Sequence, residues 1–205
     1  MVTKEILQSH YREYAAQPEE WVANMAATKK SIVKCVVEEL NYHPREKVRV
    51  AVLGASDKRY LSIHEKIFCE VFCQPVEVVT YDLDSKHLKD AGNVVEHDVT
   101  EPFPQTGFSV VFSHELLKFL TPSEQVQALR NAYHALQTGG IAMHVVHAPS
   151  LYGTAELREW QYRVDPNHLL ENVANEAISG RLLRFESESN VDWLRETCVI
   201  LFEKR

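Results

Sequence analysis

Several features that mark particular protein classes are missing from this sequence. Only four of its 205 residues are cysteine, and none of them forms a C-x-x-C pair. Cys69 and Cys73 lie four residues apart in an apolar segment, which favours buried thiols over a metal site. No apolar run opens the chain, and none is long enough to cross a bilayer. We therefore expect a cytoplasmic protein without a signal peptide or a membrane contact.

Basic residues are also scarce. The chain has 22 lysines and arginines against 29 aspartates and glutamates, which gives a net charge of -7. A nucleic-acid-binding domain usually presents a basic face, and the short clusters at 29–30 and 58–59 are too small to form one. His144 and His147 would point to opposite faces of a strand, so they predict no metal site. We expect a small-molecule partner and no nucleic acid, with the oligomeric state left open.

Apolar segments rich in β-branched residues alternate along the chain with segments of helical periodicity. This alternation predicts an α/β fold with a doubly wound, mostly parallel sheet. Residues 1–47 are predicted to be an N-terminal helical extension that packs on a core domain of residues 48–205. The segments that favour strands are 48–54, 76–81, 93–97, 108–113, 141–146, 181–186 and 197–202.

Local signals mark the ends of several helices. Pro18 precedes two glutamates, which suits the first turn of a helix. Thr121 and Glu124 have the spacing of a capping box, and Gly139-Gly140 is expected to end the helix that follows it. Further helices are expected at 60–73, 85–91 and 167–179.

Four polar or glycine residues follow predicted strands, namely Gly54, Asp82, Asp98 and His114. In open α/β sheets, ligands bind beyond the carboxyl ends of the strands. These positions therefore predict a ligand site at one edge of the sheet. Each acid also has a plainer interpretation, because Asp82 could cap a helix and Asp98 could form a turn.

Several stretches, taken in order, resemble class I S-adenosylmethionine-dependent methyltransferases. The resemblance covers roughly residues 48–205 and implies a Rossmann-like sheet of seven strands. The first strand would be central, and the last two would form an antiparallel hairpin at one edge. The stretches that carry the resemblance are VTYDLD at 79–84, EHDVTEPFP at 96–104, FSVVFSHELLKFL at 108–120, LQTGGI at 136–141, and segments 170–185 and 198–204.

The same resemblance implies S-adenosylmethionine as the cofactor. Asp82 would hold its ribose hydroxyls, and Asp98 would lie near its adenine. Leu83 and Val99 would sandwich the adenine ring. The residues expected to line the main cleft and bind the cofactor are Gly54, Ala55, Ser56, Asp82, Leu83, Asp98, Val99 and His114.

The loop after the first strand departs from the family pattern, which reads roughly acid-x-G-x-G-x-G. Gly54 is present, but Val52 stands in place of the acid, and Ser56 and Lys58 stand in place of two glycines. Glycine matters in such a loop because the backbone must approach the ligand closely. The loop is therefore degenerate, and Ser56 and Asp57 could instead cap the next helix.

His114 and Glu115 are the candidate catalytic residues, because a histidine at the mouth of the fourth strand could remove a proton from an acceptor. Both could equally be a polar cap of that strand. Aromatic residues at two places could cover the cleft or simply pack against the core. They are Tyr11, Tyr14 and Trp21 near the N-terminus and Tyr152, Trp160 and Tyr162 after the fifth strand.

Three functions are consistent with these observations. The first is S-adenosylmethionine-dependent methyl transfer to a small-molecule acceptor. The second is a methyltransferase-like binding or regulatory protein that has lost cofactor binding, for which the degenerate loop is the evidence. The third is a nicotinamide-dependent reductase, although the chain has neither a G-x-G-x-x-G fingerprint nor a Tyr-x-x-x-Lys pair.

Overall fold

A computed structural model describes residues 4–44, 47–88, 93–147, 157–174, 178–186 and 196–205. Within these ranges it contains one sheet of seven strands in the order β3-β2-β1-β4-β5-β7-β6. The strands are β1 (Val48–Leu53), β2 (Val76–Asp82), β3 (Val94–Glu96), β4 (Phe108–His114), β5 (Leu136–His147), β6 (Gly180–Glu186) and β7 (Glu196–Glu203). The helices are α1 (Lys4–Ala15), α2 (Glu19–Glu39), α3 (Arg59–Phe72), α4 (Pro122–Ala135) and α6 (Pro166–Val173), with 3-10 turns η1 (Ser85–Leu88) and η2 (Leu117–Phe119).

The topology confirms the expected Rossmann-like methyltransferase sheet. β1 lies at its centre and pairs in parallel with both β2 and β4. β3 and β5 extend the parallel part on either side. β7 then runs antiparallel between β5 and β6, so the last two strands form the predicted hairpin at one edge.

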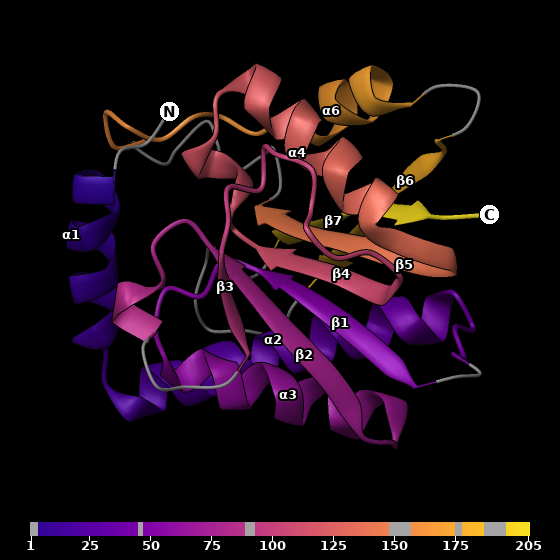
Figure 1. Cartoon of the computed structure of the whole chain (residues 1–205), viewed down its shortest axis with the longest axis horizontal. Coiled ribbons are helices and arrows are strands. Elements are labelled where there is room, and N and C mark those ends of the chain that lie inside the picture. The colour runs from indigo at the N-terminus through magenta and orange to yellow at the C-terminus, as the bar shows by residue number, and fades with distance from the viewer. Residues whose placement is uncertain (1–3, 45–46, 89–92, 148–156, 175–177, 187–195) are drawn as a thin grey trace.

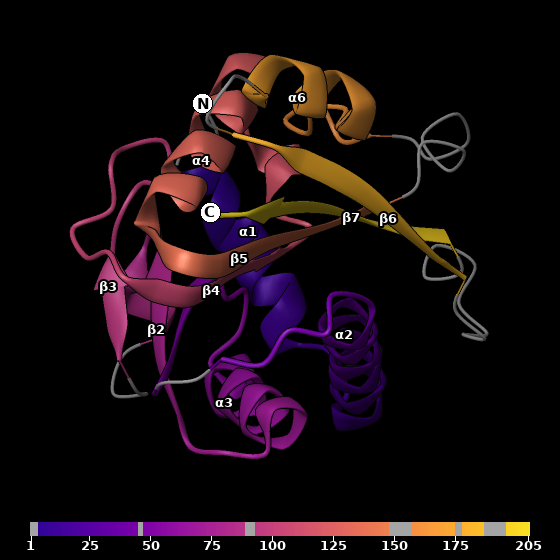
Figure 2. The same cartoon turned by 90° about the vertical axis from the view of Figure 1, so that its right-hand side faces the viewer.

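Helices cover both faces of this sheet, as Figure 2 shows, with α4 and α6 on one side and α2 and α3 on the other. Alternate residues of β1 supply the two cores. Val48, Val50 and Val52 belong to the apolar cluster under α2 and α3, whereas Ala51 and Leu53 belong to the opposite one. This division follows from the two-residue period of a strand that is buried on both faces.

The helix signals were confirmed in part. Glu124 N donates to the Thr121 hydroxyl, and the Glu124 carboxylate accepts from Thr121 N at 2.8 Å, so the capping box at the start of α4 is present. Gly139-Gly140 does not end this helix, contrary to expectation. α4 ends at Ala135, and both glycines lie inside β5, where Gly139 has φ +77° and its N–H donates to the Lys204 carbonyl.

Two predicted helices are shorter than expected. The segment after β2 makes only the 3-10 turn η1, and the rest of that prediction lies at 89–91, outside the described residues. α6 ends at Val173, while the predicted helix extended to 179, with 175–177 not described. Among the helices that the structure describes, none combines the length and apolar character needed to cross a membrane.

The N-terminal helices are placed differently. α2 packs beside α3 through Val22, Met25 and Tyr60. α1 instead stands across the end of the sheet toward which the arrows of β1, β4 and β5 point (Figure 1). This edge, where the parallel strands end, is where the sequence predicts the ligand site.

Candidate functional site

A cleft of about 680 Å³, partly open to solvent, lies at this carboxyl edge beneath α1. Seven of the eight predicted cofactor residues line it, namely Gly54, Ala55, Ser56, Asp82, Leu83, Asp98 and Val99. His114 does not, which corrects the prediction that it lines the main cleft. Its side chain lies along a neighbouring cavity.

Asp82 is the most connected side chain of the cleft. It ends β2 and is only 5% exposed. One carboxylate oxygen accepts from Ala55 N at 2.8 Å, and the other accepts from the Tyr11 hydroxyl at 2.7 Å. Burial raises the pKa of the Asp82 carboxyl, and these hydrogen bonds oppose that shift. The carboxylate thus joins the loop after β1 to helix α1.

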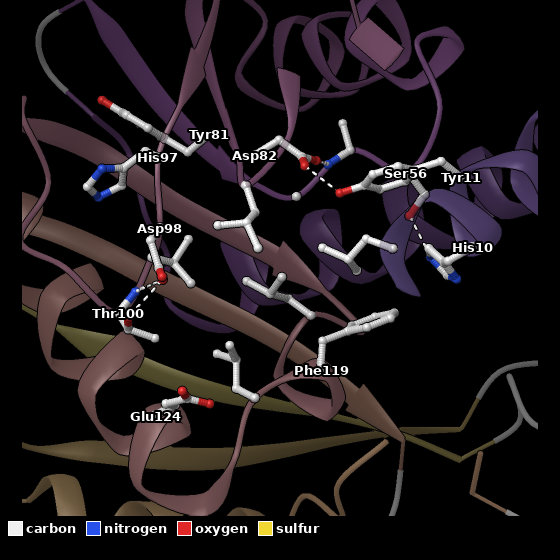
Figure 3. A pocket seen from close by; sticks show the side chains of 17 residues that line it. His10, Tyr11, Ser56, Tyr81, Asp82, His97, Asp98, Thr100, Phe119 and Glu124 are labelled. Atoms are coloured by element: carbon white, nitrogen blue, oxygen red, sulfur yellow. Dashed lines mark hydrogen bonds between the residues drawn. The ribbon is translucent and has the colours of Figure 1, made fainter. Parts of the chain in front are cut away.

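Helix α1 brings two side chains to the cleft: Tyr11, which the sequence suggested as a possible cover of the cleft, and His10, which it did not. Tyr11 stacks on His87 with ring centroids 3.6 Å apart while its hydroxyl reaches Asp82. His10 is the residue before Tyr11, and its Nε2 lies 3.1 Å from the Ser56 hydroxyl. Figure 3 shows both contacts, with the α1 residues on one side of the pocket and Asp98, Thr100 and Glu124 on the other.

Three further contacts fix α1 at this place. Lys4 pairs with Glu96 of β3 at 2.7 Å, and Glu13 forms a two-pronged ion pair with Arg158. Leu7 packs with Tyr11 against partly buried apolar residues of the core. The helix therefore spans the edge of the sheet from β3 to the segment after β5 and forms one wall of the cleft.

The loop after β1 takes a shape that its sequence explains. Gly54 has φ +79°, a left-handed conformation that glycine adopts without strain. Asp57 accepts from the N–H of Arg59, the first residue of α3, but the N-cap position belongs to Lys58, which makes no capping bond, so neither Ser56 nor Asp57 is the N-cap. Ser56 instead faces the cleft and bonds to His10. Lys58 is exposed and lines an outer hollow, so its bulk stays out of the cleft.

Arg59 connects the same loop to the N-terminal helices. Its guanidinium donates to the buried carboxylate of Asp57, to Glu19, and to the carbonyls of Tyr14 and Gln17. These bonds hold the turn between α1 and α2 against the loop after β1. The position of α1 over the cleft thus has support from both of its ends.

The far side of the cleft contains Asp98 and apolar side chains. One Asp98 oxygen accepts from the backbone N–H and the hydroxyl of Thr100, so the turn-forming role is present. Leu83, Val99, Leu116 and Leu120 supply apolar walls around it. The faces of a flat aromatic ring such as adenine can pack against such walls. That Leu83 and Val99 sandwich the ring stays a prediction.

A second cavity lies on the other side of residues 54–56. Its open space is about 530 Å³, and it holds both candidate catalytic residues, His114 and Glu115. Glu115 has φ +58°, a left-handed conformation that is unusual for this residue, and its carboxylate pairs with Lys118 at 3.2 Å. Strained backbone is often retained at functional sites.

Little in the sequence indicated the other residues of this cavity. Lys29 and Tyr60 line it from α2 and α3, yet each stands in an ordinary helical pattern. His144, weighed as a metal ligand, is instead buried in β5 with its Nδ1 2.9 Å from the Ser113 hydroxyl. The described part of the chain contains no group of three potential metal ligands.

The aromatic residues noted in the sequence have separate places. Tyr14 lines the second cavity, and the ring of Trp21 packs edge-on against the ring of Tyr14. Trp160 stacks on Phe119, which contributes to both cavities. Tyr162 donates its backbone N–H to the Lys118 carbonyl, whereas Tyr152 lies outside the described residues.

Comparison with known proteins agrees with this architecture. Residues 54–144 match a family described as a methyltransferase domain. No curated protein matches the sequence.

Several solved structures share the fold at low sequence identity. A TehB-like S-adenosylmethionine-dependent methyltransferase from Corynebacterium glutamicum is 18% identical with a TM-score of 0.60, over 97% of this chain and 100% of that chain. The N-methyltransferase NodS from Bradyrhizobium japonicum is 10% identical with a TM-score of 0.62, over 98% and 97%. A methyltransferase from Clostridium acetobutylicum is 11% identical with a TM-score of 0.61, over 88% and 91%. Over residues 54–144 the chain is thus similar to a methyltransferase domain, and its seven-stranded sheet has the fold of class I S-adenosylmethionine-dependent methyltransferases.

Proposed function

We propose that this chain binds S-adenosylmethionine in the main cleft and transfers its methyl group to a small-molecule acceptor. The observation that carries the proposal is the buried carboxylate of Asp82, fixed at the end of β2 by Ala55 N and facing a cleft with apolar walls. Apart from the residues of α1, the cleft lining lies within the region that matches a methyltransferase domain, which favours methyl transfer over nicotinamide chemistry. The NodS structure was solved with S-adenosylhomocysteine, which supports the same ligand class here.

The residues present fit such a cofactor in most respects. Asp82 offers a carboxylate for two ribose hydroxyls, and charge-assisted hydrogen bonds of this kind are strong. Leu83 and Val99 offer apolar surfaces for the adenine, with Asp98 beside them. The described lining of the cleft contains no lysine or arginine to repel a cationic sulfonium group.

One feature requires a change on binding. The Tyr11 hydroxyl already donates to an Asp82 oxygen that a ribose hydroxyl would use. Asp84 N also donates to that oxygen, at 3.3 Å. The two ribose hydroxyls therefore compete with Tyr11, and we expect the Tyr11 ring to shift along His87 when the cofactor enters.

The chemistry divides between the ligand and the chain. S-adenosylmethionine supplies an activated methyl group, so the protein mainly positions donor and acceptor and excludes water. Helix α1 closes the cleft from one side and limits water access. His114 and Glu115 stand in the adjoining cavity, where a proton released by the acceptor can be taken up by the imidazole.

Calorimetric titration of the full chain with S-adenosylmethionine, S-adenosylhomocysteine and NADPH tests the proposal. We expect both adenosyl ligands to bind and NADPH to give no heat of binding. Binding of NADPH alone would overturn it. Incubation with radiolabelled S-adenosylmethionine and candidate acceptors then tests transfer.

A second candidate function has its own observation. The Tyr11–Asp82 and His10–Ser56 contacts fill with protein groups two positions that a cofactor would use. The chain would then be a methyltransferase-like binding or regulatory protein without cofactor. Absence of heat with both adenosyl ligands at millimolar concentration, in the native chain and in Tyr11→Phe, would establish this alternative.

A further inference from the structure

The second cavity has a chemical character that methyl-donor binding does not explain. Four parts of the fold enclose it: α1, α2, α3, and the end of β4 with the turn that follows. They contribute His10 and Tyr14, Lys29, Tyr60, and His114, Glu115, Leu116, Lys118 and Phe119, respectively. Gly54, Ala55 and Ser56 form its wall toward the main cleft. A molecule here would therefore lie against the ligand of the main cleft.

Lys29 is a buried cation in the wall of this cavity. The residue is 8% exposed, and its Nζ lies 3.2 Å from His64 Nε2 and 4.0 Å from the centre of the Tyr60 ring. No ion pair involves Lys29 within the part of the chain that the structure describes. Burial lowers the pKa of Lys29 to about 7. An ammonium group held in this way is stabilised by an anionic partner, which a ligand can provide.

A second polar group in the same wall is unsatisfied. Tyr60 is 3% exposed, and its hydroxyl has no hydrogen-bond partner among the described residues. A buried hydroxyl without a partner destabilises the folded protein. A ligand oxygen that accepts from both Tyr60 and Lys29 would remove this cost and supply the missing negative charge.

The remaining charges do not cancel Lys29. Glu115 is the acid that lines the cavity, and its carboxylate is paired with Lys118 at 3.2 Å. Tyr14, Tyr60 and Phe119 give the cavity aromatic walls. These walls favour a flat ring, because stacked or edge-to-face rings gain energy beyond their buried area.

We propose that the second cavity is the acceptor site and that it takes a small aromatic molecule bearing an anionic oxygen, which Lys29 and Tyr60 hold. Carboxylate and phenolate share this chemistry. The role as acceptor site rests on the proposed function, whereas anion binding by Lys29 does not. In the transfer, a lone pair of this oxygen would form the bond to the methyl carbon as the sulfonium carbon–sulfur bond of the donor breaks, and S-adenosylhomocysteine would leave as a neutral thioether.

The pH dependence of binding follows from the groups around Lys29. They are His64 and Tyr60 on α3, His10 and Tyr14 on α1, and His114, Glu115 and Lys118 after β4. The ammonium form of Lys29 is the one that attracts an anion, and it is lost as pH rises through the Lys29 pKa of about 7. Anion affinity should therefore fall between about pH 6.5 and 8.5, with roughly tenfold weaker binding per pH unit above the pKa.

The test uses the full chain without cofactor and follows benzoate and benzamide by calorimetry at pH 6.5. Losing a charge-assisted hydrogen bond weakens binding by about 10- to 150-fold, so we expect benzoate to bind at least about tenfold more tightly than benzamide. Lys29→Met should abolish this preference. Lys30→Met is the matched control, because Lys30 is a neighbouring surface lysine paired with Glu70, and it should leave the preference intact.

Three results would overturn the proposal: equal binding of benzoate and benzamide, benzoate binding that is unchanged in Lys29→Met, or benzoate affinity that does not fall above pH 7. If Lys29→Met does not fold, Tyr60→Phe and the pH profile of the native chain still test it. Benzoate and 4-nitrophenolate, offered separately, distinguish a carboxylate from a phenolate acceptor.

Failure of the proposed function gives a different result. If benzoate binds through Lys29 but no adenosyl ligand binds, the anion site stands and its assignment as an acceptor site is overturned along with the proposed function. If the adenosyl ligands bind but benzoate affinity is the same in the native chain and in Lys29→Met, the proposed function stands and the anion site is overturned.

Discussion

The two cavities on either side of residues 54–56 differ in charge although they share a wall. Asp82, Asp98 and Glu124 line the main cleft, and the described lining includes no lysine or arginine. The second cavity contains Lys29 and Lys118, with Glu115 as its acid. One short loop therefore separates a site suited to a cationic group from a site suited to an anionic one.

This difference shows how a degenerate glycine loop can still serve a two-ligand site. The loop needs little bulk on its cleft side, and it keeps Gly54 where the backbone takes a left-handed conformation. Selectivity can come from the walls opposite, which belong to β2 and the segment after β3 on one side and to α2 and α3 on the other. The following predictions test whether the two cavities can be perturbed separately.

The largest effect concerns His10, which lines both cavities. Burial, followed by the charge of Lys118, lowers the His10 pKa to about 4. Between pH 6.5 and 4 the unfolded chain therefore takes up a proton that the folded chain does not. The free energy of unfolding should fall as pH drops through this window, with a His10 share of about 3 kcal/mol.

Urea unfolding at pH 6.5, 5.5 and 4.5 measures this loss in the native chain and in His10→Gln. The variant should lose less stability over the window, because its side chain takes up no proton. If the free energy of unfolding fell equally with pH in the two proteins, His10 would not be buried as a neutral ring, and the wall between the cavities would need a different description.

The next effect is confined to the main cleft. Asp82→Ala should weaken S-adenosylmethionine binding about 10- to 150-fold, because a buried charge-assisted hydrogen bond typically contributes 1.5–3 kcal/mol. Benzoate binding in the second cavity should be unchanged. Calorimetry with each ligand, after thermal unfolding has shown that the variant folds, checks both parts. Equal losses for the two ligands would mean that the cavities are not separate sites.

The sequence was sufficient to predict the sheet and much of the main cleft. Strand ends fall at residues such as Gly54, Asp82 and Asp98, and parallel strands bring their carboxyl ends to one edge whatever the details of packing. This regularity explains why strand ends could predict Gly54, Asp82 and Asp98 as cleft residues, whereas the other four cleft residues were predicted from the family resemblance. The prediction for Gly139-Gly140 was wrong for a different reason, because a glycine pair can end a helix or kink a strand.

The second cavity could not be predicted in the same way. Lys29 lies inside a segment of helical pattern, away from any predicted strand end, and nothing in the local sequence distinguishes it from its neighbour Lys30. Its burial depends on how α2 packs against α3, where it meets Tyr60 and His64. Tyr11 is similar, because only the tertiary placement of α1 brings its hydroxyl to Asp82.

A smaller effect should follow from Tyr11→Phe. The variant keeps the ring on His87 and removes the hydroxyl that competes for Asp82. A hydrogen bond contributes about 1 kcal/mol net, so the cofactor should bind roughly fivefold more tightly while the apo protein unfolds about 1 kcal/mol more readily. Calorimetry and urea unfolding measure the two changes. Tighter binding without loss of stability would show that the hydroxyl leaves Asp82 in solution.

The smallest effect is expected at the two positions where the loop lacks glycine. Lys58 is exposed and lies outside both cavities, so Lys58→Gly should change cofactor affinity by no more than about twofold. Ser56 lies in the wall between the cavities and bonds to His10, so Ser56→Gly should leave affinity similar or raise it slightly, because it removes a side chain from the shared wall. Both variants are titrated with S-adenosylmethionine beside the native chain. A tenfold gain in S-adenosylmethionine affinity from Lys58→Gly would contradict the described loop. It would place the lysine side chain in the path of the ligand, so that the missing glycine, rather than the walls of the cleft, would limit binding.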